Sequence, residues 1–141
     1  ICRFISAHPQ YRHLFGAVSI SSRYPSSTRA LLVRFLEQNH LHADLATLVK
    51  ARHGIRMPDG GVTDVVGSTA GQMPVLLRQY LKLNARLVGF NVDPDFGDAL
   101  DALMVVDLTA VDHTILARYF GREGAETFLA YHTAASRSQA A

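Results

Sequence analysis

Six polar residues lie at the predicted ends of three strands, where their side chains could carry out proton-transfer chemistry. They are Ser19, Ser21, Asn91, Asp93, Asp95 and Asp101. Alternation along each strand places them on one rim of the predicted sheet. Carboxylates that lie close together raise one another's pKa, which is a way to tune one of them as a base. An acidic rim of this kind would also attract a cationic amine.

Two roles are assigned within this rim. Asn91, Asp93 and Asp95 are the candidate catalytic residues, and Ser19, Ser21 and Asp101 are the candidate substrate-binding residues. The structural alternative is that Asp93 and Asp95 cap a tight turn around Pro94. Asp107 differs from this group because it lies inside an apolar strand, where a charge must be paired. We expect it to form a structural ion pair, and Arg86 is the plausible partner.

The elements that position these residues follow from hydrophobic periodicity and breaker residues. Strands are predicted over residues 11–21, 86–92 and 102–109. Helices are predicted over 26–39, 73–84, 112–120 and 124–133, with a short one over 44–52. The Gly-rich stretch from Gly60 to Gly71 is interpreted as turns within a long loop, and residues 134–141 as a frayed tail.

The order of these elements predicts an α/β fold, with a small mixed sheet flanked by helices. The crossover from the first strand to the second favours a parallel relation, and the short loop before the third strand favours an antiparallel one. The expected strand order is 11–21, 102–109, 86–92, with the middle strand antiparallel to both neighbours. Because such a sheet is thin, we expect it to be half of a wider sheet. Residues 1–8 resemble the last turns of a helix that begins upstream, so we expect a longer protein.

Composition excludes several classes of protein. The 141 residues are 48% hydrophobic and 18% charged, which is typical of a folded domain. No apolar run approaches the roughly 18 residues of a membrane span, and a single cysteine excludes a disulfide framework. Metal is not expected, since the run from Asp93 to Asp98 lacks the glycine and glutamate of a calcium loop. The pair His40 and His42 lacks a nearby third ligand.

The charge is distributed unevenly along the chain. Residues 1–56 carry a balance of +6 and residues 57–141 a balance of −4, which together give a net charge of +2. Pairing of two faces within one domain is the simpler explanation of this asymmetry. Arginines and tyrosines in the basic half suggest nucleic acid, but no recognition motif accompanies them, so no nucleic-acid partner is expected.

Three segments resemble the GNAT-like hemolysin family, which is related to the ornithine-lipid N-acyltransferases. They are Leu14-Phe15-Gly16-Ala17-Val18-Ser19-Ile20-Ser21, the run from Pro74 to Phe96, and Asp101-Ala102-Leu103-Met104-Val105-Val106-Asp107-Leu108. The resemblance covers roughly residues 1–133 and is most specific from Pro74 to Leu108. It implies that these residues are the C-terminal part of a GNAT-like fold, which transfers a fatty acyl group from a thioester carrier to an amine in bacterial lipid biosynthesis.

The resemblance also implies the partners of the chain. Acyl-ACP or acyl-CoA would be the co-substrate of the intact protein, whose carrier-phosphate turn would precede Ile1. No cofactor is expected in this chain, which alone would be inactive. The basic half would meet an acidic carrier protein or anionic lipid headgroups, and the location would be cytoplasmic or peripheral at the inner membrane face. The alternative is a non-catalytic α/β interaction module that self-associates through its sheet edge, as a homodimer.

Overall fold

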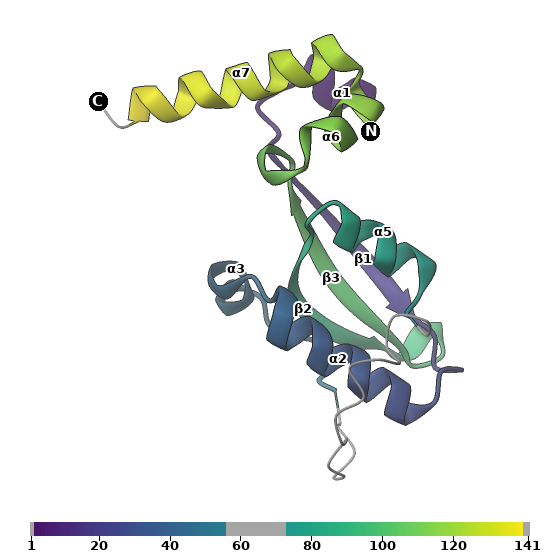
Figure 1. The fold of residues 1–141 in the computed structure, drawn as a ribbon. Coiled ribbons are helices and arrows are strands. Elements are labelled where there is room, and N and C mark those ends of the chain that lie inside the picture. Colours follow the sequence, from purple (N-terminus) through teal and green to yellow (C-terminus); the bar gives the residue numbers. More distant parts are fainter. Residues whose placement is uncertain (1, 56–72, 140–141) are drawn as a thin grey trace. The chain divides into compact units, whose positions relative to one another are not determined.

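A computed structural model describes residues 2–55 and 73–139 of the chain (Figure 1). The chain divides into two compact units. The first unit contains Ile1–Leu14 together with Val106–Ala141, and the second contains Phe15–Val105. The Gly-rich stretch from Gly60 to Gly71 and most of the predicted loop around it lie outside the described residues.

The sheet has three antiparallel strands. They are β1 (His13–Ile20), β2 (Arg86–Asp93) and β3 (Ala99–Asp107), in the order β1-β3-β2. This confirms the α/β class, the strand order and the antiparallel middle strand, but the sheet is antiparallel and not mixed as predicted. The most apolar strand is β3, and it lies in the centre of the sheet. There the strands on both sides and the helices keep its side chains away from water. It begins three residues earlier than predicted, and the 3-10 turn η2 (Leu108–Ala110) follows it.

The register between β2 and β3 brings candidate residues together. Asn91 lies opposite Asp101, and Phe90 lies opposite Ala102. A bulge interrupts the register between Leu87 and Gly89, and bulges of this kind re-aim the side chains beside them. The edge of β2 that faces away from β3 is hydrogen-bonded, near both of its ends, to the segment that follows the helix Ser26–His40. There, the His42 amide donates to the Leu87 carbonyl at 2.8 Å, and the Val92 amide donates to the His53 carbonyl at 3.1 Å.

The described residues of the second unit form four helical segments. They are α2 (Ser26–His40), α3 (Ala43–Leu48), α5 (Val75–Lys82) and the 3-10 turn η1 (Pro94–Phe96). Leu32, Val33 and Leu36 of α2 are buried, as are Val18 and Ile20 of β1. Helix α3 is shorter than the predicted 44–52. At the start of α3, the Nδ1 atom of His42 accepts from the Leu45 amide. None of the side chains of α3 is fully buried.

The first unit packs three helices around a small core. They are α1 (Cys2–Ala7), α6 (His113–Phe120) and α7 (Arg122–Gln139). The core residues include Ile5, Leu116 and Phe128. Asp112 begins α6 by accepting from the Thr114 amide at 2.9 Å, as N-caps do. Helix α7 continues six residues beyond the predicted end at 133, because the alanines in this stretch favour the helix. No helix in the described part of the chain is long and apolar enough to cross a membrane.

Asp107 forms the expected ion pair, but its partner is Arg12 and not Arg86. The Arg12 Nε and Nη2 atoms donate to the two carboxylate oxygens at 2.9 and 2.6 Å. Arg86 instead donates to the carbonyl of Asn39 at 3.2 Å. The prediction of Arg86 was wrong because it considered only the pattern along the sheet. The residue that precedes β1 lies close enough to pair, since the Leu108 amide bonds to the Arg12 carbonyl.

The Arg12–Asp107 pair predicts a stability that depends on pH. Partial burial raises the pKa of Asp107, but hydrogen bonds from Arg12 and Thr109 and the charge of Arg12 outweigh it, so the pKa lies well below its ordinary value. A depressed pKa in the folded state adds stability at pH values above the unfolded pKa of about 3.9. That contribution is lost as the pH falls through the folded value. His13 Nε2 lies 3.9 Å from the same carboxylate and adds attraction where it is protonated.

Replacement of Asp107 by asparagine should isolate this charge, since the amide oxygen can still accept from the Thr109 amide. The Arg12 side chain is 45% exposed and the Asp107 side chain 29%. Solvent therefore screens the pair, and we expect the free energy of unfolding at pH 7 to fall by about 1 kcal/mol. Urea denaturation at pH 7 and pH 3 measures this effect, with Asp44→Asn as the control. A loss that is equally large at pH 3 would show that the charge is not responsible.

Candidate functional site

Three of the six candidate residues meet on the exposed side of the sheet. The odd-numbered residues of β1 are exposed and Val18 and Ile20 are buried, so Ser19 points away from the core. Its hydroxyl donates to the Oδ1 atom of Asp101 at 2.6 Å, which is a short, charge-assisted hydrogen bond. Asn91 lies opposite Asp101 on the other neighbouring strand. A serine, a carboxylate and an amide therefore line up across the three strands.

A pocket of about 330 Å³ lies beside these residues, within the second unit. Its floor comes from all three strands and one wall comes from the segment after α3. The lining residues are Ala17, Val49, Lys50, Ala51, Arg52, Gly89, Phe90, Asn91, Asp101 and Leu103. This volume is at the lower end of the range for small-molecule sites. We call it the Asp101 pocket.

Asn91 holds one wall of the Asp101 pocket in place. Its Oδ1 atom accepts from the backbone amide of His53 at 2.9 Å, and its Nδ2 atom donates to the Val92 carbonyl at 3.0 Å. An asparagine amide carries two N–H groups, so one of them stays available to a ligand. Asn91 therefore has two roles. It positions the segment that carries Lys50 and Arg52, and it lines the pocket itself.

Asn91 and Asp101 line the Asp101 pocket, and Ser19 contacts this lining through its hydrogen bond to Asp101, but the other three candidates are bonded elsewhere or exposed. Asp93 accepts from the Asp95 amide at 3.0 Å and so begins η1, while Asp95 is exposed. The hydroxyl of Ser21 accepts from the Arg23 amide at 3.2 Å in the turn before α2. These contacts correspond to the turn-capping alternative for Asp93. The six-residue rim is thus reduced to Ser19, Asn91 and Asp101.

Two basic residues of the pocket were not predicted. Lys50 and Arg52 line it together with Asp101, but their segment was interpreted as the end of a helix and the start of a loop. The signal that could have found them is the basic run Lys50-Ala51-Arg52-His53, which directly follows the apolar residues of α3. Its place beside the sheet depends on the contacts of His53 with β2, which no local pattern reveals.

The pocket combines one negative and two positive side chains. The carboxylate of Asp101 can hold an ammonium group, and Lys50 and Arg52 can hold an anionic group at the same site. Apolar contributions from Ala17, Val49 and Leu103 suit an uncharged segment between them. Among the described residues, no three His, Cys, Asp or Glu side chains gather in a way that could hold a metal ion.

Comparisons with protein-family models, with curated proteins and with solved structures each find no match. The chemistry of the pocket and the arrangement of the sheet are therefore what bear on the function of the chain.

Proposed function

We propose that this chain is the acceptor side of an N-acyltransferase and that the Asp101 pocket binds the amine that receives the acyl group. One observation carries the proposal. The Ser19 hydroxyl, the Asp101 carboxylate and the Asn91 amide cross the three strands in one line beside a pocket that can admit a small ligand. This arrangement agrees with the resemblance to GNAT-like N-acyltransferases of the hemolysin and ornithine-lipid type.

The residues present can serve the first half of such a reaction. The carboxylate of Asp101 attracts a protonated amine and accepts a proton from it, directly or through one water molecule. The neutral nitrogen then attacks the carbonyl of a thioester, a carbon–nitrogen bond forms, and the carbon–sulfur bond breaks with release of the thiol. Ser19 holds the carboxylate in one orientation, and the free N–H of Asn91 can donate to the carbonyl oxygen of the thioester as negative charge develops on it.

The thioester carrier would come from outside this chain. Lys50 and Arg52 give the pocket positive charge, which suits the acidic surface of a carrier protein or the phosphates of acyl-CoA. The carrier-phosphate turn itself would lie upstream of Ile1. The same positive charge suits anionic lipid headgroups, so the intact protein would act in the cytoplasm, in peripheral contact with the inner membrane face.

The position of β1 supports a partial GNAT-like fold. β1 is the first strand in the order β1-β3-β2, so one of its edges has no partner strand among the described residues (Figure 1). Exposed backbone groups at a sheet edge are readily paired by a further strand. Residues encoded upstream would supply that strand and complete the wider sheet.

The test uses the polypeptide together with the residues encoded upstream of Ile1. Acyl-ACP and acyl-CoA are each offered with a panel of primary amines, and the N-acyl product is measured by mass spectrometry. The proposal expects transfer by the longer polypeptide and none by residues 1–141 alone. Absence of transfer from both carriers to every amine would contradict it, as would micromolar binding of acyl-CoA by residues 1–141 alone.

The free edge of β1 also favours a second candidate, a module that forms a homodimer by pairing two β1 strands. The side chain of Phe15 on this strand is 57% exposed. Since a charge on an edge strand opposes pairing, Phe15→Lys should weaken the dimer about tenfold or more, as measured by sedimentation equilibrium. Phe96→Lys, at the exposed turn η1, is the matched control. A chain that stays monomeric at all concentrations would rule this candidate out.

A further inference from the structure

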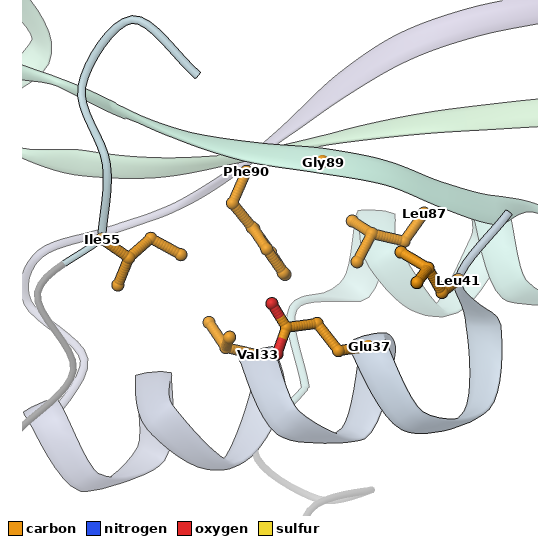
Figure 2. A pocket seen from close by; sticks show the side chains of 7 residues that line it. All are labelled: Val33, Glu37, Leu41, Ile55, Leu87, Gly89 and Phe90. Atoms are coloured by element: carbon orange, nitrogen blue, oxygen red, sulfur yellow. The ribbon is translucent and has the colours of Figure 1, made fainter. Parts of the chain in front are cut away.

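A second pocket lies between β2 and α2. Its volume is about 310 Å³, and it is lined by Val33, Glu37, Leu41, Ile55, Leu87, Gly89 and Phe90. Figure 2 shows the side chains of Val33 and Glu37 rising from α2 toward Phe90, which points down from β2, while Leu41, Leu87 and Ile55 stand at the sides. We call it the Glu37 pocket.

Among the described residues of this lining, Glu37 is the one charged side chain. It is exposed, so solvent and solutes can reach it. Among the described residues it has no ion-pair or hydrogen-bond partner. Arg86, the first residue of β2, donates to the carbonyl of Asn39 near the end of α2. The carboxylate therefore faces an apolar pocket without a cation of its own.

The rest of the lining favours a cation on an aliphatic stem. The carboxylate of Glu37 and the ring of Phe90 approach the same space from opposite elements (Figure 2). A carboxylate attracts an ammonium group, and an aromatic ring attracts it through the negative face of its π system. The branched side chains of Val33, Leu41, Ile55 and Leu87 would contact methylene groups, as they do around the stems of lysine side chains.

We propose that the Glu37 pocket binds an aliphatic primary ammonium group, either of a free alkylamine or of a lysine side chain. This proposal does not depend on acyl transfer at the Asp101 pocket, which uses a different carboxylate, although Gly89 and Phe90 of β2 line both pockets. It names a binding site with its own ligand chemistry: a carboxylate and an aromatic ring for the charge, and aliphatic walls for the stem.

The test is an NMR titration of residues 1–141 with three probes of equal chain length: pentylammonium, 1-pentanol and pentanoate. We expect pentylammonium to bind about fivefold more tightly than pentanol, and pentanoate to bind most weakly. The shifted amide signals should include that of Leu87, which lines only the Glu37 pocket, whereas Phe90 lines both pockets. Added sodium chloride should weaken pentylammonium binding and leave pentanol binding unchanged, because only the first involves charge.

Two variants make the result specific. Glu37→Gln keeps the size of the side chain and should remove the preference for pentylammonium over pentanol at the amide signal of Leu87, which lines the Glu37 pocket and not the Asp101 pocket. Glu126→Gln, an exposed glutamate on α7, is the matched control and should keep that preference. Equal binding of pentylammonium and pentanol by the unmodified chain would overturn the proposal, as would an unchanged preference in Glu37→Gln.

A fourth probe identifies the source of the ammonium group. Nα-acetyl-lysine methylamide carries the same stem and charge within a peptide-like frame. Binding of this probe at least tenfold tighter than that of pentylammonium would assign the pocket to a lysine of a protein partner. Equal or weaker binding would assign it to a free alkylamine. Failure of both probes to shift the amide signal of Leu87 would contradict the proposal.

Discussion

Asp101→Asn in the polypeptide that includes its upstream residues is expected to lower the rate of acyl transfer about a hundredfold or more. The asparagine keeps the shape of the side chain and can still accept from the Ser19 hydroxyl, which is 2.6 Å from Asp101. It cannot accept a proton from the amine or attract an ammonium group by charge. A positioned base contributes a factor of about 10² to 10⁴, so the loss should be large even where the fold is intact.

The measurement is the steady-state rate of product formation over a range of amine concentrations. Loss of the base should lower kcat, and loss of the ammonium contact should raise KM for the amine. Asp44→Asn, an exposed aspartate in the first turn of α3, is the control and should retain the rate of the unmodified protein. Circular dichroism confirms that the variants fold. An Asp101→Asn protein with full activity would place the base elsewhere.

Ser19→Ala tests the same site more mildly. It removes the hydroxyl that orients the carboxylate but leaves the base, so its effect should be smaller than that of Asp101→Asn. The order of the two effects distinguishes a catalytic carboxylate from one that only holds two strands together. In the second case, both variants would lower stability by similar amounts and neither would change the rate in the folded fraction.

The sheet could be predicted because its determinants are local. The apolar run of β3 requires cover on both sides, which places it in the centre. The short connection through Asp93 and Gly97 allows only an antiparallel neighbour. The long crossover from β1 to β2 then leaves β1 for the remaining side of the centre. No step of this reasoning needs the position of a distant side chain.

The candidate site could be predicted only in part, because its walls depend on distant contacts. Ser19 and Asp101 were found from the alternation of side chains along their strands, and they meet through the register of those strands. Lys50 and Arg52 were missed because their segment has no periodic pattern and is held by the bonds between His53 and β2. Arg12 was missed as the partner of Asp107 for the same reason, since 95 residues separate the two in the chain.

Gly16 and Tyr80 present another such contact, which no periodicity reveals. Gly16 lies in β1, and a Cβ atom built on it would overlap the hydroxyl of Tyr80 and lie 3.0 Å from its Cζ atom. The tyrosine of α5 thus occupies the space that a side chain of β1 would fill. The absence of a side chain at this position lets α5 approach the sheet.

Gly16→Ala should therefore destabilise the protein by about 2 kcal/mol, although alanine is otherwise preferred to glycine within a strand. The added methyl group must displace the tyrosine ring, because its hydroxyl occupies the position of the new Cβ atom. Urea denaturation of four proteins measures the coupling: the unmodified chain, Gly16→Ala, Tyr80→Leu and the double variant. The shorter leucine vacates the space of the hydroxyl, so Gly16→Ala should cost much less in its presence and can become stabilising.

Gly54→Ala, where a Cβ meets nothing within 4 Å, is the matched control and should change stability little. Equal effects of Gly16→Ala with tyrosine and with leucine at position 80 would show that the two residues do not compete for this space.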